Sequence, residues 1–578
     1  MTHDSQPAAE PDPVPYVPAD AESEALDQGE APPAGSGGGL FRSSAIMAAG
    51  TFASRITGVV RTMVLVAALG TQALGDTFNT ANTIPNIIYE TLLGGVLTAA
   101  HVPLLVRARQ RSAKYGEEFE QRLFTLLLGT LALFTAAAMA LAPLLIRMYA
   151  GGFPPAQRDL ATVFLLFFLP QIFFYGFSAV AGASLNAQGR FAAPMWCPVL
   201  NNVVVCAVGL TFIFVAGGPV DPDTITGGEV TLIAVGTTVG VVLQALGLIP
   251  SLYRMGFRWR PRVDFRPGEL RSMGTMAGWT LVFVAAQQLG LFVYTNIANS
   301  AGARGVEEGI RYGVGLTPWV NAYQFFQLPF AIAAVSVITA LFPRMSRSAA
   351  EGRLDRVADD LSSGLRLSLI IIIPSALLLF GLSAEICVVF FAHGATGIAD
   401  ALVIADVLRV FAVALIPYAA LQLLQRGFYA ITDTRTPALV GIFTTVVSIA
   451  LALAGYRLLP TDRIVMGIAF AQGVAWTLGC AVMAVLLHRR LGTLHGRAIA
   501  APIVKAVLAG LPALVLTLVI HAFIVRRFGQ GLVPALTGLA TGGLLGGALF
   551  LLLARLLRID EITALGRTVA ARLPGRRP

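Results

Sequence analysis

Long apolar stretches recur along most of the chain after residue 40, and short polar segments separate them. Each stretch is long enough to cross a bilayer core of about 30 Å, which takes roughly 20 residues of helix. The pattern predicts an all-α polytopic membrane protein with about 14 transmembrane helices. These helices are expected near residues 44–69, 76–106, 121–147, 159–186, 192–216, 229–253, 270–298, 315–342, 363–390, 400–430, 436–457, 463–487, 500–525 and 533–557.

The composition excludes a soluble globular protein. Of the 578 residues, 56% are hydrophobic and 13% are charged, whereas soluble domains carry about 25% charged residues. The formal net charge is +9, but the first 41 residues contain eight acids and neither Lys nor Arg, which leaves 41 basic residues against 24 acids, or +17, in the rest. In a membrane protein this excess belongs to cytoplasmic loops, so we expect no nucleic acid as a partner.

Basic residues in the loops orient the predicted helices. Basic clusters follow the second, sixth, eighth, twelfth and last helices, whereas loops 70–75, 217–228 and 391–399 contain no Lys or Arg. Because positive residues are retained on the cytoplasmic side, we expect a multi-pass protein of the cell membrane with both termini cytoplasmic. Some arginines on the predicted outer side depart from the rule, among them Arg457, Arg463, Arg526 and Arg527.

Two six-helix segments of the chain resemble each other. Gly182 and Gly427 begin similar helix junctions, and Pro85 and Pro329 lie 244 residues apart in comparable stretches. Six helices is an even number, so the two copies insert in the same orientation, and a transport site is expected between them. The predicted divisions are an acidic, disordered cytoplasmic tail, an N-lobe, a C-lobe, and two further helices with a basic C-terminus, at residues 1–40, 41–258, 259–495 and 496–578.

The first helix carries two arginines inside an otherwise apolar run. Arg55 and Arg61 lie about 120° apart around the helix, so both can border one wide cavity, and Gly58 leaves room for close approach. An arginine near the bilayer centre costs about 2.5–3.5 kcal/mol and normally faces water or a partner. A guanidinium pair suits a diphosphate, whose oxygens arginine binds in pairs. The alternative is that these side chains reach to the membrane interface.

A polar stripe follows one face of the second helix at intervals of three and four residues: Asp76, Asn79, Thr83, Asn86 and Glu90. Pro85 and the glycines at 94 and 95 predict a bend there. Asp76 is interpreted as an N-cap at the outer interface. Glu90 is the candidate counter-charge for the arginines, and its carboxylate could also take up a proton.

The seventh and eighth helices place uncharged amides opposite this stripe, at Gln287, Gln288, Asn321, Gln324 and Gln327. Two interpretations stay open, because such amides either line a cavity or join helices by hydrogen bonds.

No sequence pattern indicates catalysis, a cofactor or a metal. Nucleotide-binding, zinc-protease and serine-hydrolase motifs are missing. The four cysteines are scattered, and we expect buried thiols rather than disulfides or zinc ligands at Cys197, Cys206, Cys387 and Cys480. The chain is therefore expected to be neither an enzyme nor an ATP-driven pump.

Several short motifs occur in a fixed order along the chain. The pattern SRxxGxxR begins at Ser54, DTF begins at Asp76, and IPN ends at Asn86. YQFFQLP begins at Tyr323, and GFYA at Gly427 precedes DTRTP. Together these motifs, from about residue 44 to 557, resemble the MurJ family of lipid II flippases in the multidrug/oligosaccharidyl-lipid/polysaccharide exporter superfamily.

The resemblance implies two six-helix lobes and two additional C-terminal helices that help to form a groove for the polyprenyl tail. It also implies that Arg55 and Arg61 contact the lipid diphosphate, and that Ser54, Gly58, Asp76 and Asn86 occupy other motif positions. At two places this chain departs from the family's pattern. Thr83 and Tyr89 stand where some members have basic residues, and Gln324 and Gln327 stand where they have Arg and Glu.

We therefore predict a flippase that moves lipid II, the undecaprenyl-diphosphate-linked disaccharide-pentapeptide of peptidoglycan biosynthesis, from the inner to the outer leaflet by alternating access. Membrane lipids and cell-wall synthesis proteins are further expected partners. The alternatives are an exporter of another polyprenyl-linked glycan or of a drug, and a membrane scaffold for cell-wall synthesis. The predicted substrate-binding residues are Arg55, Arg61, Ser54, Gly58, Asp76, Asn86, Glu90, Gln324 and Gln327.

Overall fold

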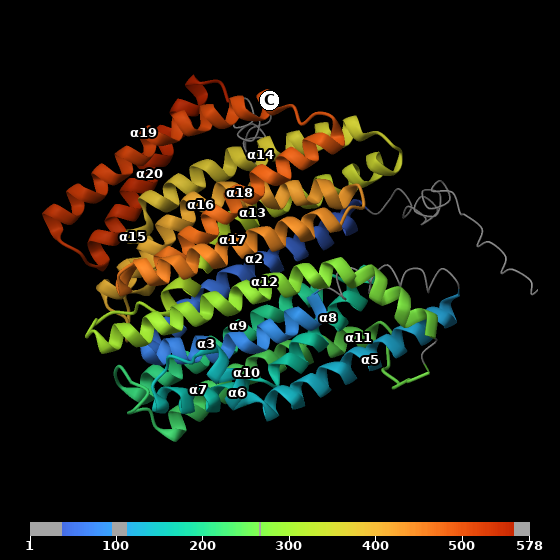
Figure 1. Cartoon of the computed structure of the whole chain (residues 1–578), viewed down its shortest axis with the longest axis horizontal. Helices are drawn as coiled ribbons and strands as arrows, with labels where there is room; N and C mark the ends of the chain where they lie inside the picture. Colours follow the sequence, from blue (N-terminus) through green and yellow to red (C-terminus); the bar gives the residue numbers. More distant parts are fainter. Residues whose placement is uncertain (1–36, 95–111, 265–266, 560–578) are drawn as a thin grey trace, which may run out of the picture. The chain divides into compact units, whose positions relative to one another are not determined.

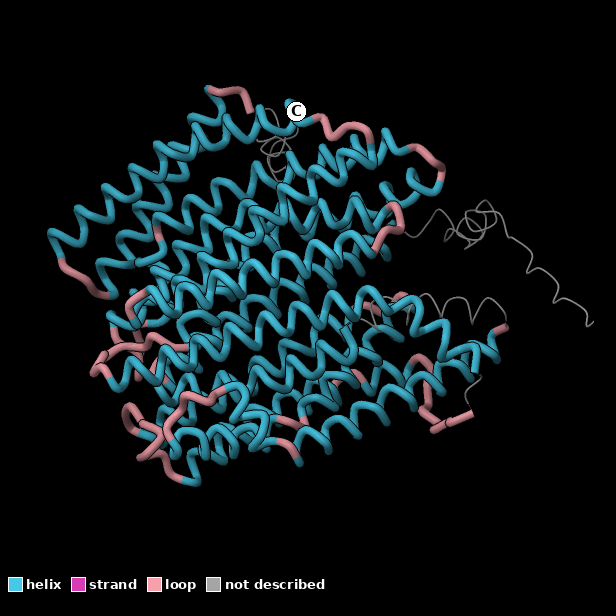
Figure 2. Tube along the Cα trace, in the orientation of Figure 1, coloured by secondary structure: helices cyan, strands magenta, loops and turns pink. Residues whose placement is uncertain are grey.

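The computed structural model describes residues 37–94, 112–264 and 267–559, and helices account for nearly all of them (Figure 1, Figure 2). These described ranges contain no strand. The predicted all-α class is confirmed. Below, residues 50–264 are called the N half and residues 267–559 the C half.

The N half consists of long helices and shorter pieces of helix. Its elements are α2 (Gly37–Leu69, which begins before residue 50), α3 (Ala73–Tyr89), the π-helical turn η1 (Glu90–Gly94), α5 (Ala113–Ala140), α6 (Ala142–Tyr149), α7 (Pro155–Phe168), α8 (Gln171–Ala187), α9 (Ala192–Ala216), α10 (Gly227–Leu246) and α11 (Ile249–Arg254).

Three predicted N-half helices are each divided in two, and a proline lies at every break: Pro143, Pro170 and Pro250. Proline lacks an amide hydrogen and clashes with the preceding turn, so it fits at a helix start and interrupts a continuing helix. The bend predicted near Pro85 takes the form of the π-helical turn at Glu90–Gly94, which follows α3 directly.

The C half consists mainly of longer helices. Its elements are α12 (Pro267–Glu307), α13 (Leu316–Ala350), α14 (Leu354–Gly381), α15 (Ser383–Phe391), α16 (Ile398–Ala430), α17 (Arg435–Leu458), the 3-10 turn η3 (Thr461–Arg463), α18 (Ile464–Leu491), α19 (Gly496–Phe528) and α20 (Leu532–Leu556).

Eleven helical segments of the described chain are long and apolar enough to cross a membrane. The predicted spans 76–106, 315–342 and 400–430 are not among them, so the count of fourteen stays a prediction. Two of these spans correspond to α13 and α16, and more than half of the α16 side chains are buried. The third continues into residues 95–106, outside the described residues.

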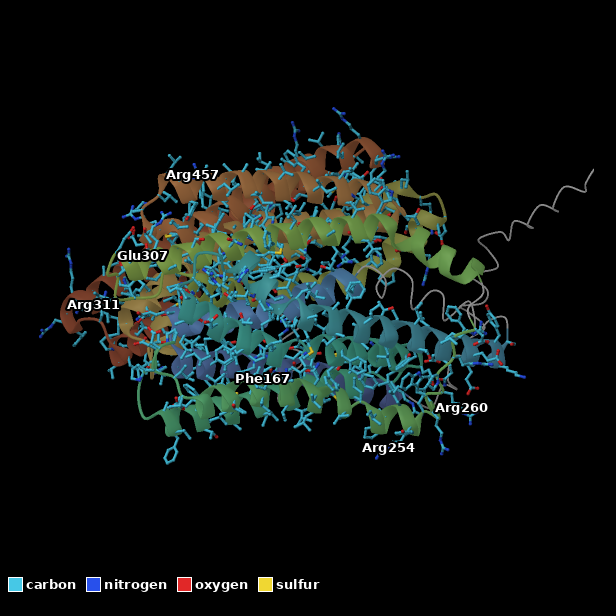
Figure 3. The ribbon with its side chains drawn as sticks, turned by 60° about the horizontal axis from the view of Figure 1, so that its bottom comes forward. Phe167, Arg254, Arg260, Glu307, Arg311 and Arg457 are labelled. Carbon is cyan, nitrogen blue, oxygen red and sulfur yellow. The ribbon has the colours of Figure 1, made fainter. Side chains whose placement is uncertain are left out.

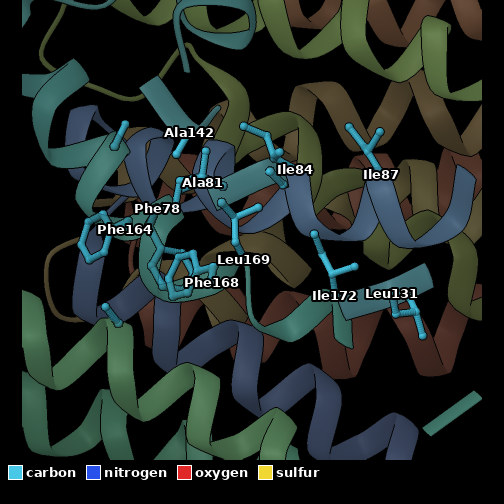
Figure 4. Close-up of a cluster of buried hydrophobic side chains, with 14 of the residues drawn as sticks. Phe78, Ala81, Ile84, Ile87, Leu131, Ala142, Phe164, Phe168, Leu169 and Ile172 are labelled. Carbon is cyan, nitrogen blue, oxygen red and sulfur yellow. The ribbon is translucent and has the colours of Figure 1, made fainter. Parts of the chain in front are cut away.

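The N-half core surrounds α3, as Figure 4 shows. The Phe78 ring meets Phe164 and Phe168 of α7 edge-on, with ring centroids 6.0 and 5.3 Å apart. These rings and their neighbours Ala81 and Ile84 are almost completely buried. Aromatic pairs prefer such edge-on packing, so α7 holds α3 at a fixed angle and fixes the face that α3 turns to the interior.

In the C half, α16 is the central helix. It packs against α13, α14 and α18, and most of its side chains are buried. The last two helices, α19 and α20, pack against each other and along α14 and α15. The predicted division at residues 258 and 495 remains a prediction, because α12 also contacts α3 and α6 of the N half.

Charged side chains lie at the two ends of the helices. Figure 3 places Arg254 and Arg260 at one end and Glu307, Arg311 and Arg457 at the other. Large apolar side chains between the ends face outward, including Phe214, Phe523 and Leu544, which are 88%, 65% and 73% exposed. An apolar surface of this kind belongs in hydrocarbon, and it agrees with a multi-pass membrane protein.

Two predictions concern residues at the margins of the described chain. Helix α2 begins at Gly37, within the last four residues of the predicted tail 1–40, and the extent of that tail stays a prediction. Residues 1–36 and most of the basic cluster after the second helix lie outside the described residues. All four cysteines are free thiols; Cys387 is buried, as expected, whereas Cys197, Cys206 and Cys480 are only partly buried.

Candidate functional site: a cavity between the two halves

A cavity of about 300 Å³ lies where the N half meets the C half. Five N-half helices, α2, α3, α8, α9 and α10, form most of its wall, and α13 of the C half closes it. We call it the N-half cavity. Its lining includes Arg61, Asn79, Asn82, Thr83, Asn86, Tyr175, Asn201, Asn321, Gln324 and Gln327.

Arg61 is the charged group of this cavity. Its side chain is half-buried, and its Nε is buried without a hydrogen-bond partner among the described residues. No Asp or Glu of the described chain is among the lining residues. A guanidinium without a neighbouring carboxylate keeps its donors free for an anion, and arginine binds phosphate oxygens through paired hydrogen bonds.

Amide side chains supply the rest of the polar lining. Asn82 Oδ1 and Asn321 Nδ2 are buried without partners in the described part of the chain. Gln324 Oε1 instead accepts a hydrogen bond of 2.8 Å from Thr62 Oγ1, and this bond joins α13 to α2. The structure therefore places the predicted Asn86, Gln324 and Gln327 at one cavity, where they act partly as lining and partly as a link between helices.

Arg55 does not line this cavity, and its side chain is exposed. It precedes Thr62 by seven residues, which is nearly two full helical turns, so both residues point to the same side of α2. Thr62 contacts α13 on that side. Arg55 therefore lies on the side of α2 that faces the C half, about 10 Å along the helix from Thr62.

Ser54 and Gly58 lie where α2 contacts α9. Asn202 Nδ2 donates to the Ser54 carbonyl oxygen at 3.1 Å and to Thr57 Oγ1 at 3.0 Å. The same Nδ2 would lie 3.6 Å from a Cβ at Gly58. These two motif positions hold α2 in place and are not among the residues that line the cavity.

Asp76 does not cap its own helix, and that interpretation is wrong. The residue at the start of α3 is Gln72, whose side chain makes no capping bond. The buried Asp76 Oδ1 instead accepts bonds of 2.7 Å from Thr317 N and Thr317 Oγ1, at the first turn of α13. Free backbone amides at a helix start attract a carboxylate, and glycine at 315 allows the approach because a Cβ there would collide with Asp76.

A second buried carboxylate, Asp400, also joins the two halves. Below, the contacts of Asp76 and Asp400 are together called the outer closure. Asp400 Oδ1 accepts from Thr71 Oγ1 at 2.5 Å and from Gly313 N at 2.8 Å. Nearby, Thr396 Oγ1 donates to the Val66 carbonyl oxygen at 2.9 Å. Together with Asp76 these bonds join the two halves at the end that loop charges predict to be outer. Sequence reasoning missed Asp400, although an acid in the first turn of a helix was a visible signal.

Glu90 does not act as a counter-charge in this structure. It is exposed at the start of the π-helical turn, and the described residues contain no ion pair between Glu90 and Arg55 or Arg61. Asp433, the first residue of the DTRTP motif, accepts a hydrogen bond from Thr436 N at 2.9 Å at the start of α17.

The fold and the polar cavity between two helical halves define a membrane transporter. A solved structure titled as an inward-facing multidrug resistance MATE family transporter of the MOP superfamily matches with a TM-score of 0.61 and 15% identity, over 76% of this chain and 95% of that chain. One titled "Lipid II flippase MurJ, inward closed conformation" matches with a TM-score of 0.69 and 20% identity, over 89% of this chain and 99% of that one.

The family follows from the sequence comparison. The family model described as "Lipid II flippase MurJ" matches residues 65–537, so the chain belongs to the MurJ family. The "Probable lipid II flippase MurJ" of Rhizobium meliloti (strain 1021) is 27% identical over 465 residues, which cover 78% of this chain and 81% of the relative. The "Lipid II flippase MurJ" of Burkholderia cenocepacia is 27% identical over 430 residues, 73% of this chain and 78% of that protein.

Proposed function

We propose that this chain moves lipid II from the inner to the outer leaflet of the cell membrane by alternating access. The observation that carries the proposal is the half-buried Arg61, which lines a cavity with amides and no carboxylate among the described residues. Family membership names the cargo class, and this lining suits its diphosphate. A cationic drug would instead favour acids in the cavity, which argues against a drug exporter.

In this proposal the two arginines act in sequence. Arg55 is exposed on the side of α2 that faces the C half and meets the diphosphate first. Arg61 receives it in the cavity, where fewer water molecules screen the charge. Asn86, Gln324 and Gln327 offer hydrogen bonds to the polar head, while the polyprenyl chain stays in lipid along α19 and α20.

Rocking of the halves would break the outer closure and open the cavity to the other side. Asp76 and Asp400 hold that closure through hydrogen bonds to Thr317 and Thr71. Because each elementary charge that crosses 100 mV is worth about 2.3 kcal/mol, the membrane potential can drive a cycle that uses no nucleotide.

The direct test is depletion of the protein, followed by a leaflet-resolved assay for precursor in the inner leaflet. Wild-type chain should relieve the accumulation, and Arg55→Ala and Arg61→Ala chains that still insert should not. Arg457→Ala is the matched control, because this exposed arginine lies at the end of α17 away from the cavity. Normal cell-wall growth with both arginine variants would refute the proposal.

We further propose that both termini are cytoplasmic. We also propose that the chain binds cell-wall synthesis proteins as partners but does not serve as a scaffold for them. Single cysteines placed in loop 217–228 and beside Arg260 should label from opposite sides of the membrane. Deletion of residues 1–36 should leave lipid II movement intact; a scaffold that recruits enzymes through this acidic tail would lose its function instead.

A further inference from the structure

A second and larger cavity lies inside the C half. Its volume is about 740 Å³, and its walls are α12, α13, α16, α17 and α18. We call it the C-half cavity. It extends from Thr434 and Tyr429, at the junction of α16 and α17, to Trp319 and Ser448 deeper in the bundle. Its size falls within the roughly 300–1,000 Å³ of ligand-binding pockets.

The polar lining of this cavity is uncharged except at one point. Among the described residues that line it there is no Asp or Glu. Gln287 Oε1 accepts from Thr445 Oγ1 at 2.7 Å, and Gln472 Oε1 accepts from Trp319 Nε1 at 3.3 Å. These bonds fix the carbonyl end of each amide and leave the Nε2 hydrogens available to a ligand.

Gln288 supplies an acceptor as well. Its Oε1 is buried and has no hydrogen-bond partner among the described residues. A buried polar atom without a partner costs roughly 1–3 kcal/mol, so a retained one indicates that something outside the chain satisfies it. A ligand that carries both donors and acceptors, such as hydroxyl and amide groups, would do so.

Flat aromatic faces form the other part of the lining. Trp319 and Tyr323 stack at 5.6 Å between ring centroids with an interplanar angle of 9°. Tyr418 and Trp476 lie 4.8 Å apart. Aromatic rings that alternate with amides favour a ligand with one apolar C–H face and a rim of polar groups, as a pyranose ring has.

Arg426 is the single cation among the described residues that line this cavity. Its side chain is exposed, its guanidinium carbon lies 5.7 Å from the centre of the Tyr429 ring, and it forms no ion pair within the described part of the chain. An exposed guanidinium at the rim of the cavity can contact an anionic group of a ligand. That group would remain outside, while a neutral part of the same ligand enters the cavity.

We propose that the C-half cavity is a second cargo site, which binds the neutral sugar and amide groups of the disaccharide-pentapeptide head. This inference rests on the proposed function and divides the cargo between two cavities. Arg61 in the N-half cavity holds the diphosphate, and Gln288, Gln472 and the aromatic faces hold sugar. A small cation is the competing occupant, and it would require oxygen ligands of negative charge that the described lining lacks.

The test uses the purified full-length chain and a soluble disaccharide-pentapeptide without phosphate or lipid. Two of the five tryptophans, Trp319 and Trp476, line the cavity, so tryptophan fluorescence reports binding there. We expect a saturable change in fluorescence with the wild-type protein, and most of that change should be lost in Trp476→Phe. Gln288→Leu should bind the head at least about fivefold more weakly, because it lacks one hydrogen bond to the ligand.

Gln244→Leu is the matched control, because Gln244 lies on α10 outside both cavities. It should bind like wild type. Thermal unfolding of Gln288→Leu should occur at the wild-type temperature or above it, since the variant removes a buried acceptor that has no partner in the folded chain. Equal binding by Gln288→Leu and Gln244→Leu would overturn the proposal, and so would the absence of a fluorescence change with the soluble disaccharide-pentapeptide. So would a change produced by sodium chloride alone and not by choline chloride.

Transport of intact lipid II in proteoliposomes distinguishes failure of the second cargo site from failure of the proposed function. If the wild-type protein transports lipid II but does not bind the soluble head, the second site is refuted and the proposed function is unaffected. Protein that binds the head in the C-half cavity but moves no lipid II would sink the proposed function and leave the site standing.

Discussion

The two cavities are built from corresponding helices of the predicted repeat but carry different chemistry. The N-half cavity is about 300 Å³, and it combines Arg61 with asparagines from α3. The C-half cavity is about 740 Å³, and it combines glutamines with stacked aromatic rings such as Trp319 and Tyr323. The two copies of the predicted repeat thus hold different cavities, a compact one suited to an anion and a wide one suited to neutral groups.

The difference teaches that a repeat conserves the positions of helices and leaves the site free to change. Function resides in the side chains that a fold presents. Here α13 takes part in both cavities, because Tyr323 lines each of them. Movement of this one helix would therefore affect both sites together.

The largest expected difference between the cavities is the effect of removing their cations. Arg61→Gln should lower lipid II transport by about 10- to 100-fold, because charge-assisted hydrogen bonds in a half-buried site contribute roughly 1.5–3 kcal/mol. Arg426→Gln should lower it only a few-fold, because solvent screens an exposed guanidinium. Transport in proteoliposomes measures both, and equal losses would break the proposed division of the cargo.

The hydrogen bonds of Asp76 and Asp400 join the two halves at the end of the helices that loop charges predict to be outer. Asp400→Asn removes the charge from a carboxylate that accepts hydrogen bonds from Thr71 and Gly313, which should weaken the closed state by about 1–2 kcal/mol. A thiol reagent applied from the outside should then label a cysteine at Asn79 about tenfold faster. Unchanged labelling would show that other contacts hold the closure.

Two threonines offer a matched pair, one at each cavity. Thr62 donates to Gln324 across the halves, and Thr445 donates to Gln287 within the C half. Thr→Val at either position removes one hydroxyl and should cost about 1 kcal/mol. We expect Thr62→Val to change the transport rate and Thr445→Val to change mainly the thermal unfolding temperature. The reverse pattern would place the link between the halves elsewhere.

The smallest effect is expected at the support of the N-half cavity. Asn202→Ala removes the hydrogen bonds to Ser54 and Thr57 and should lower stability by about 1 kcal/mol or slightly more. Transport should fall no more than twofold, because Asn202 does not line the cavity. A transport loss as large as that of Arg61→Gln would mean that the position of α2 matters as much as its charge.

Local pattern alone determined the membrane class, the approximate positions of the helices and the polar face of the second helix. Helix 192–216, for example, was predicted with both ends as they appear in α9. These features depend on neighbouring residues, since the length of an apolar run and the spacing of its polar positions are fixed within a few turns.

Only the tertiary structure decided which polar residues meet. Asp76 and Thr317 are 241 positions apart, and Thr71 and Asp400 are 329 apart. The sequence could place Arg55 and Arg61 on one helix, but only packing put Arg61 against a cavity and left Arg55 exposed. The C-half cavity could not be predicted from the sequence for the same reason. Its lining comes from five helices, and a hydropathy pattern records how apolar each helix is without recording the space that several helices enclose.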